Sequence, residues 1–223
     1  MQTTEEEGAG LPADNRLALR QVARGCRKAA LSTLGAEDGA PYVSLVTVAL
    51  DHDLSPVLLL SGLADHTRNL AADRRVSLLF DGTDGHPNPQ TGPRVTLSGR
   101  AERSDDPRLA ARFLARHPGA AQYAGFADFG WWRVVPERVH FVGGFGRAVW
   151  FSAPFGLDPQ VVEAFAVAEA EKPSLVLPEG WALVGVDCDG ADMIHNDKFT
   201  RISFKDGVKT ISEACDCLVF SLS

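Results

Sequence analysis

The chain has 223 residues, of which 45% are hydrophobic and 23% are charged, and its formal net charge is −7 at pH 7. This balance is ordinary for a globular protein with one large domain or a domain and a small appendage. The acidic excess argues against non-specific nucleic-acid binding, which needs a basic face. The sequence has no apolar run of about 18 residues and no basic, apolar leader. We therefore expect no membrane span and a cytoplasmic location.

The first part of the chain is predicted to hold a helix followed by two strands. Residues 1–13 are expected to form a flexible tail. Apolar residues at three- and four-residue spacing predict a helix over Asp14–Thr33, with Asp14 or Asn15 as its cap. A turn cluster follows it, and two apolar runs then predict strands at Pro41–Asp51 and Pro56–Ser61.

The middle of the chain alternates strands with short helices and one long loop. Asp65 is expected to cap a helix over residues 65–72, and Val76–Phe80 is predicted to be the next strand. Gly82–Pro93 is long for a hairpin connection and rich in turn formers. Strict alternation then predicts a strand over Arg94–Glu102. One face of that strand is expected to carry Val95, Leu97, Gly99 and Ala101.

After this strand a helix is predicted to begin at Asp106-Pro107, which places Asp at the cap and Pro at the first helical position. Two closing strands are predicted between Trp131 and Val142. A composition break at Phe151–Pro159 indicates a domain boundary, and a further helix starts at its end. The remaining predicted elements are strands at Trp181–Val186 and Phe199–Phe204 and a helix at Ile211–Phe220.

Short links between most of the strands predict a largely antiparallel sheet. A small closed barrel follows, because closure removes the exposed edges of a sheet. We therefore predict an α+β protein. Residues 14–152 would form an antiparallel split β-barrel with peripheral helices, and residues 158–223 a small C-terminal α+β domain.

The predicted helix at residues 65–72 carries unusual side chains in its first turn. His66 and Arg68 lie where the helix dipole disfavours cations. A bound anion would explain them, because free backbone N–H groups, the Thr67 hydroxyl and an arginine fork suit a phosphate. The alternative is a capped surface helix whose Arg68 is solvated.

Other candidate residues are weaker. The run Gly143–Arg147 does not open a helix, as a dinucleotide-binding motif must. Its glycines are expected at a bulge or barrel corner, or where the backbone approaches a flat ring, with Arg147 supplying charge. His140 lies in a predicted strand and is expected to be structural. Cys215 and Cys217 lack a second pair of ligands, so no metal site is expected.

Three segments resemble one known family. The string HTRNLAADRRVSLLFDG, at residues 66–82, is similar to the phosphate-binding segment of the FMN-binding split-barrel proteins, the pyridoxamine 5′-phosphate oxidase-like superfamily. RVHFVGGFGRAVWF, at residues 138–151, resembles the last barrel strand of the haem-utilisation (HugZ-type) branch. WALVGVDCDG, at residues 181–190, resembles the small C-terminal domain of that branch. The resemblance covers about residues 14–220.

This resemblance implies a homodimer with a small-molecule site at its interface and FMN as the cofactor. Ser44 and Thr47 would contact the ring, and Ser61 would lie beside the phosphate or ribityl chain. Arg147 would stand at the barrel mouth. The phosphate itself would be held by His66, Thr67, Arg68 and Asn69.

Three functions stay open at this point. The first is a flavin-dependent oxidoreductase of unknown substrate, in which the flavin supplies the chemistry and no protein base is required. The second is haem binding and degradation, although that branch places its haem-ligating histidine near the C-terminus and the last histidine here is His195. The third is a non-catalytic regulator that binds a cofactor or a protein partner.

Overall fold

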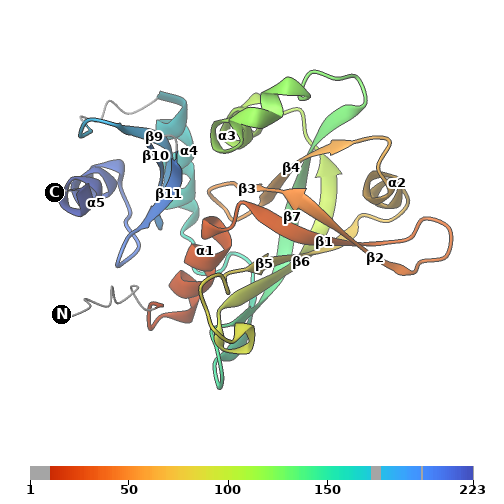
Figure 1. Ribbon diagram of the computed structural model, residues 1–223, viewed down its shortest axis with the longest axis horizontal. Coiled ribbons are helices and arrows are strands. Elements are labelled where there is room, and N and C mark those ends of the chain that lie inside the picture. Colours follow the sequence, from red (N-terminus) through yellow and green to blue (C-terminus); the bar gives the residue numbers. More distant parts are fainter. Residues whose placement is uncertain (1–10, 172–176, 197, 223) are drawn as a thin grey trace.

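The computed structural model describes residues 11–171, 177–196 and 198–222, and its largest element within them is an eight-stranded antiparallel sheet (Figure 1). Seven strands are hydrogen-bonded in the order β2-β1-β5-β6-β7-β4-β3, and β8 pairs with β7. The sheet curls into a split barrel, as predicted. Its strands are β1 (Lys28–Leu34), β2 (Pro41–Thr47), β3 (Ala49–Leu50), β4 (Pro56–Ser61), β5 (Arg75–Asp81), β6 (Arg94–Arg103), β7 (Phe129–Val142) and β8 (Ala148–Ser152).

Side-chain alternation places the hydrophobic core on the inner face of the curled sheet. In β6 the predicted inward set is confirmed, because Val95, Leu97 and Ala101 are fully buried. Burial of this apolar surface supplies most of the driving force for closing the sheet. The neighbouring strands add the buried side chains of Leu31, Leu78, Phe80, Val139 and Phe141.

The two closing strands predicted between Trp131 and Val142 are one continuous strand, β7. The register between β6 and β7 shifts next to Gly99, which lies opposite Pro136. A Cβ atom on Gly99 would collide with the carbonyl oxygen of Val135. The bulge therefore needs glycine, and it accommodates a proline that cannot donate to the ladder.

Helices pack around this sheet in the described part of the chain. Asp14 caps α1 by accepting a hydrogen bond from the backbone N–H of Arg16 at 2.9 Å, and Asp106 caps α3 from Arg108 at 2.8 Å. Both caps agree with the sequence prediction. The helices are α1 (Asn15–Gly25), α2 (Asp65–Ala72) and α3 (Pro107–Arg116), with short 3-10 helices at Pro89–Thr91 and Pro118–Gln122.

The helix predicted over Asp14–Thr33 is wrong in its second half, because α1 ends at Gly25 and β1 follows. The error arose because Cys26 and Ala29 continue the three- and four-residue apolar spacing of the helix. In β1, buried Ala29 and Leu31 alternate with more exposed neighbours, which is the pattern of a strand.

A second, three-stranded antiparallel sheet lies near the C-terminus, with the order β11-β10-β9. Strand β10 was not predicted, because its sequence GADMIH is short and its buried Asp192 interrupts the apolar pattern. The elements of this region are α4 (Pro159–Glu171), β9 (Trp181–Asp187), β10 (Gly190–His195), β11 (Lys198–Ser203) and α5 (Ile211–Leu222).

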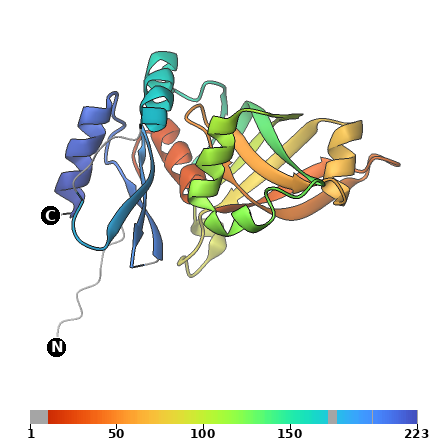
Figure 2. The same ribbon diagram turned by 90° about the horizontal axis from the view of Figure 1, so that it is seen from above.

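Helices α1 and α4 lie between the two sheets (Figure 2). Leu19 of α1 belongs to the same hydrophobic cluster as Val186 and Met193 of the small sheet and Phe141 of the barrel. The division into two domains stays a prediction. Most of the predicted N-terminal tail lies outside the described residues. None of the helices that the structure describes is both long and apolar enough to cross a membrane.

Candidate functional site

The first turn of α2 differs from the predicted phosphate cradle. Ala64, not Asp65, occupies the N-cap position, and its side chain cannot accept a capping hydrogen bond. Asp65 instead forms an ion pair with Arg68, which also donates to the carbonyl oxygen of Leu63 at 3.0 Å. Arg68 is therefore turned back onto its own helix, and a carboxylate lies where the sequence predicted an anion. The prediction that Asp65 caps this helix was wrong.

Asn69 is committed to contacts within the fold. It is 6% exposed, and its amide group donates to the hydroxyl of Thr33 at 3.0 Å. Its carbonyl oxygen accepts from the backbone N–H of Ala36 at 2.9 Å. These bonds join α2 to β1 and to the turn that follows β1, so Asn69 holds the helix against the sheet.

The structure brings Ser44 and His66 together, although they come from different elements. The Ser44 hydroxyl of β2 lies 3.1 Å from Nδ1 of His66 on α2. Burial lowers the pKa of His66 below its ordinary value, and the nearby Asp65 opposes this shift only in part. Ser61 lies close in sequence but donates its hydroxyl to Asp128 at 2.6 Å.

Arg147 and Thr47 lie apart from that pair. The run containing Arg147 forms the turn between β7 and β8, where Gly144 and Gly146 have φ angles of 119° and 75°. The Arg147 guanidinium donates to the side chain of Asn15 at 2.6 Å and stacks on the ring of Phe141. The Arg147 guanidinium is thus hydrogen-bonded to the N-terminal segment. Thr47 is exposed on β2, opposite Lys28.

The outer face of the large sheet is the second candidate surface. The strand register aligns two rows of side chains across six strands, from β2 to β8. Because Leu31, Leu78, Leu97 and Val139 point inward, both rows point outward. The first row is Val43, Ser32, Ser77, Ser98, Arg138 and Ser152. The second row is Leu45, Ala30, Leu79, Thr96, His140 and Trp150.

We call these two rows the open face. Leu45 and Trp150 are 73% and 55% exposed, which is unusual for side chains of this size. His140 stacks on Trp150 with 4.6 Å between ring centroids, and the Arg138 guanidinium lies 5.2 Å from the indole centroid. His140, expected to be structural, thus lies beside an exposed aromatic ring and a cation.

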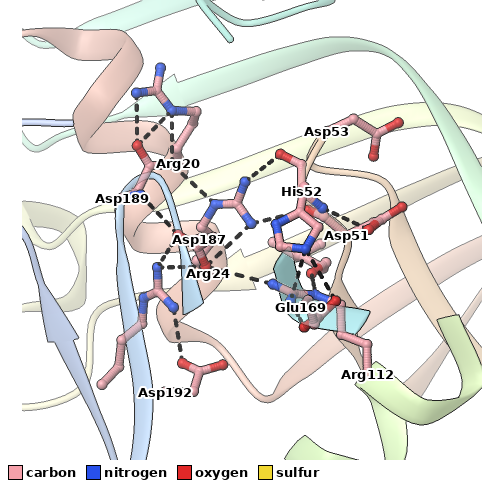
Figure 3. A network of polar contacts seen from close by, with 12 residues as sticks. Arg20, Arg24, Asp51, His52, Asp53, Arg112, Glu169, Asp187, Asp189 and Asp192 are labelled. Atoms are coloured by element: carbon pink, nitrogen blue, oxygen red, sulfur yellow. Dashed lines mark hydrogen bonds and ion pairs between the residues drawn. The ribbon is translucent and has the colours of Figure 1, made fainter. Parts of the chain in front are cut away.

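A buried network of charges joins α1 to the small sheet (Figure 3). Arg20 and Arg24 both contact Asp189, at 2.8 Å and 3.0 Å. Arg201 pairs with Asp187 at 2.8 Å. Burial alone would raise the pKa of Asp187, but the guanidinium groups of Arg201 and Arg24 hold it well below its usual range. The cavity among these side chains measures about 10 Å³, so it admits a water molecule and no substrate.

The same network continues through His52 into α3 and α4. His52 Nε2 lies 3.1 Å from a carboxylate oxygen of Glu169, which also pairs with Arg112. Sequence reasoning missed this cluster. One signal was available, since Arg20 and Arg24 lie four residues apart, on one face of α1, and so do Arg112 and Arg116 on α3.

Buried histidines should make the protein less stable in mild acid. Burial lowers the pKa values of His52 and His117, so the folded protein binds a proton on either ring less readily than the unfolded chain does. Between those pKa values and about 6.5, the unfolded chain binds protons that the folded protein does not. The free energy of unfolding should therefore fall as the pH drops below about 6.5, by up to about 1.4 kcal/mol per pH unit for each histidine.

Urea unfolding at pH 5.5, 6.5 and 7.5 measures this slope. The variant H52Q should have a shallower slope, whereas H86Q, in the exposed loop, should keep that of the wild type. A stability that is flat or rises on acidification would contradict the assignment.

Comparison with known proteins shows which family this chain belongs to. The chain is 34% identical over 179 residues to the chloroplastic non-canonical haem oxygenase HOZ of Arabidopsis thaliana. That alignment covers 78% of this chain and 54% of the relative, so the chain spans about half the length of the curated protein it matches.

Two solved structures are similar over nearly the whole chain. A protein of unknown function from Agrobacterium tumefaciens has a TM-score of 0.75 and 28% identity, covering 94% of this chain and 95% of its own. A haem-binding protein from Mycobacterium smegmatis has a TM-score of 0.62 and 27% identity, with coverage of 94% and 96%. The family profile described as pyridoxamine 5′-phosphate oxidase matches residues 17–143, which form α1 and nearly all of the split barrel. This chain therefore belongs to the pyridoxamine 5′-phosphate oxidase family.

Proposed function

We propose that this protein binds haem on the open face, as a homodimer. The observation that carries the proposal is the group formed by His140, Trp150 and Arg138 on a sheet face that one protomer leaves exposed. The names of two relatives, a haem oxygenase and a haem-binding protein, support the same ligand.

The chemistry of this group suits haem. A haem is a flat apolar ring with two propionates and an iron that needs an axial ligand. The indole of Trp150 offers a flat surface, and Arg138 has no carboxylate partner within the described residues, which leaves it free for a propionate. His140 is the candidate iron ligand. A bound haem would supply the redox chemistry, while these side chains bind and orient it.

FMN is the second candidate ligand, with a flavin-dependent oxidoreductase as the corresponding function. It is favoured by the 3.1 Å contact between Ser44 and His66, two of the predicted cofactor residues. Opposing it, Asp65 places negative charge beside the predicted phosphate position, and Asn69 is already used within the fold. We therefore rank FMN below haem.

Absorption titrations with hemin and with FMN test this proposal. We expect a saturable Soret band with hemin. The variant H140A should change the band and weaken hemin binding at least about tenfold, equivalent to about 1.4 kcal/mol. The matched control is H195A, because His195 also stacks on a tryptophan, Trp181, with 4.3 Å between ring centroids.

The possible outcomes separate the three functions. Equal weakening in H140A and H195A would contradict a specific site on the open face. Flavin bands that persist on gel filtration and disappear in H66A would support the FMN alternative. A protein that binds neither ligand would overturn both proposals and favour the non-catalytic regulator.

The homodimer is part of the proposal. Val43 and Leu45 are 62% and 73% exposed on β2, and Leu79 is 40% exposed on β5, the strand on the other side of β1. Clustered apolar side chains of this size mark interaction surfaces. A second copy presenting the same face would cover them and enclose a flat ligand between the two protomers.

A further inference from the structure

A pocket beside α2, separate from the Ser44–His66 pair, is lined by side chains that suit an anion. It lies between α2 and the paired ends of β6 and β7. Neither Ser44 nor His66 lines it. The polar side chains that line it are Thr67, Arg68, Arg74, Glu102, Arg103 and Trp132.

Two of these side chains are buried donors without partners. Thr67 and Trp132 are 4% and 5% exposed. Within the described part of the chain, neither the Thr67 hydroxyl nor the Trp132 indole nitrogen has a hydrogen-bond partner. An indole N–H can only donate, so whatever satisfies it must be an acceptor. Unpaired buried donors are costly, and their presence together at one pocket calls for a ligand.

Two of the three arginines at the pocket are also unpaired, whereas Arg68 is held by Asp65. No carboxylate partner is found among the described residues for Arg74 or Arg103, whereas the neighbouring Arg75 and Arg100 each have one. The Arg103 guanidinium lies 4.6 Å from the centroid of the Trp132 ring. A Cβ atom on the residue facing it, Gly130, would collide with that guanidinium. Glycine at this position therefore leaves room for the guanidinium of Arg103, which lines the pocket.

We propose that this pocket binds a phosphate group, as carried by a small phosphate ester. Thr67 and Trp132 line it together with the guanidinium groups of Arg74 and Arg103. Since Arg68 is already paired with Asp65, these two arginines against the single carboxylate of Glu102 leave an excess of positive charge. A phosphate offers more acceptor oxygens than a carboxylate and carries the charge to match. The inference is independent of haem or FMN binding on the other surfaces.

The indole N–H resonance of Trp132 reports on the pocket directly. We would titrate ¹⁵N-labelled protein with sodium phosphate at constant ionic strength and assign the resonance, among the four tryptophans, with W132F. A saturable shift is expected, with the dissociation constant raised at least tenfold in R103Q. The control R100Q removes an exposed arginine from the same strand and should leave the titration unchanged. A tighter titration with ribose 5-phosphate than with inorganic phosphate would identify an ester as the ligand.

A second variant keeps the proposal testable if W132F does not fold. T67V retains the shape of the side chain and removes the unpaired hydroxyl. We expect T67V to melt higher than the wild type in phosphate-free buffer and to gain less from added phosphate. A Trp132 shift that is absent or does not saturate, equal effects of R100Q and R103Q, or a lower melting temperature of T67V without phosphate would each overturn the proposal.

Discussion

The substitution D187N is expected to lower the free energy of unfolding by about 3–5 kcal/mol. Asp187 is 2% exposed and accepts hydrogen bonds from Arg201 at 2.8 and 3.0 Å. Arg24 and Arg112 lie 3.5 and 3.7 Å from Oδ2 of the same carboxylate. Asparagine keeps the shape but removes the charge, so three buried guanidinium groups lose a counterion that they share. Each keeps one other carboxylate, from Asp192, Asp189 or Glu169.

Urea unfolding measures this loss, and the chain offers a matched control. Glu137 pairs with Arg100 at 3.0 Å, but both side chains are more than half exposed. E137Q should therefore cost less than about 1 kcal/mol. A similar small cost for D187N would mean that the buried network does not hold the small sheet against α1.

A double variant separates the charge from the packing. Replacing Arg201 by methionine in the D187N background removes one of the three guanidinium groups that faced Asp187 and keeps an apolar side chain of similar length. We expect the double variant to be more stable than D187N alone, because in D187N Arg201 keeps only Asp192, a carboxylate that Arg116 already shares, and a poorly compensated buried charge costs more than a lost ion pair. Additive losses would instead indicate that the two residues act independently.

The sequence was sufficient for elements whose signals are local. Asp14 and Asp106 indicate where α1 and α3 begin, because a capping side chain accepts hydrogen bonds from N–H groups two or three residues away. The alternation of Val95 and Leu97 gives β6 and its inward face. The end of α1 was misplaced because apolar residues continue the helical spacing past Gly25, and only pairing with β2 and β5 makes this segment a strand.

The candidate site was predictable only in part, because it depends on pairing between distant strands. His140 lies between inward Val139 and Phe141, so its outward direction could have been inferred. Its neighbour Trp150 could not, since the hairpin register decides that contact. Arg20 and Asp189 are separated by 169 positions in the chain, and no local pattern brings them together.

The largest change in assembly is expected from L45D. Leu45 is 73% exposed on the outer face of β2, so an aspartate there should leave the fold of the protomer intact. In a dimer that buries the open face, each copy would instead bury an unpaired carboxylate, which costs far more than the lost apolar contact. L45D should therefore shift the protein from dimer to monomer.

Light scattering after gel filtration gives the mass directly, against 23.9 kDa for one chain. The control F220D places the same charge on an apolar side chain that is 87% exposed on α5, and it should leave the mass unchanged. A wild-type protein that elutes as a monomer, or a dimer that tolerates L45D, would contradict burial of the open face.

Hemin titration of the same variants tests whether ligand binding depends on the dimer. If two protomers enclose the ligand, L45D should weaken hemin binding together with dimerisation, because half of the surface that holds the ring would be lost.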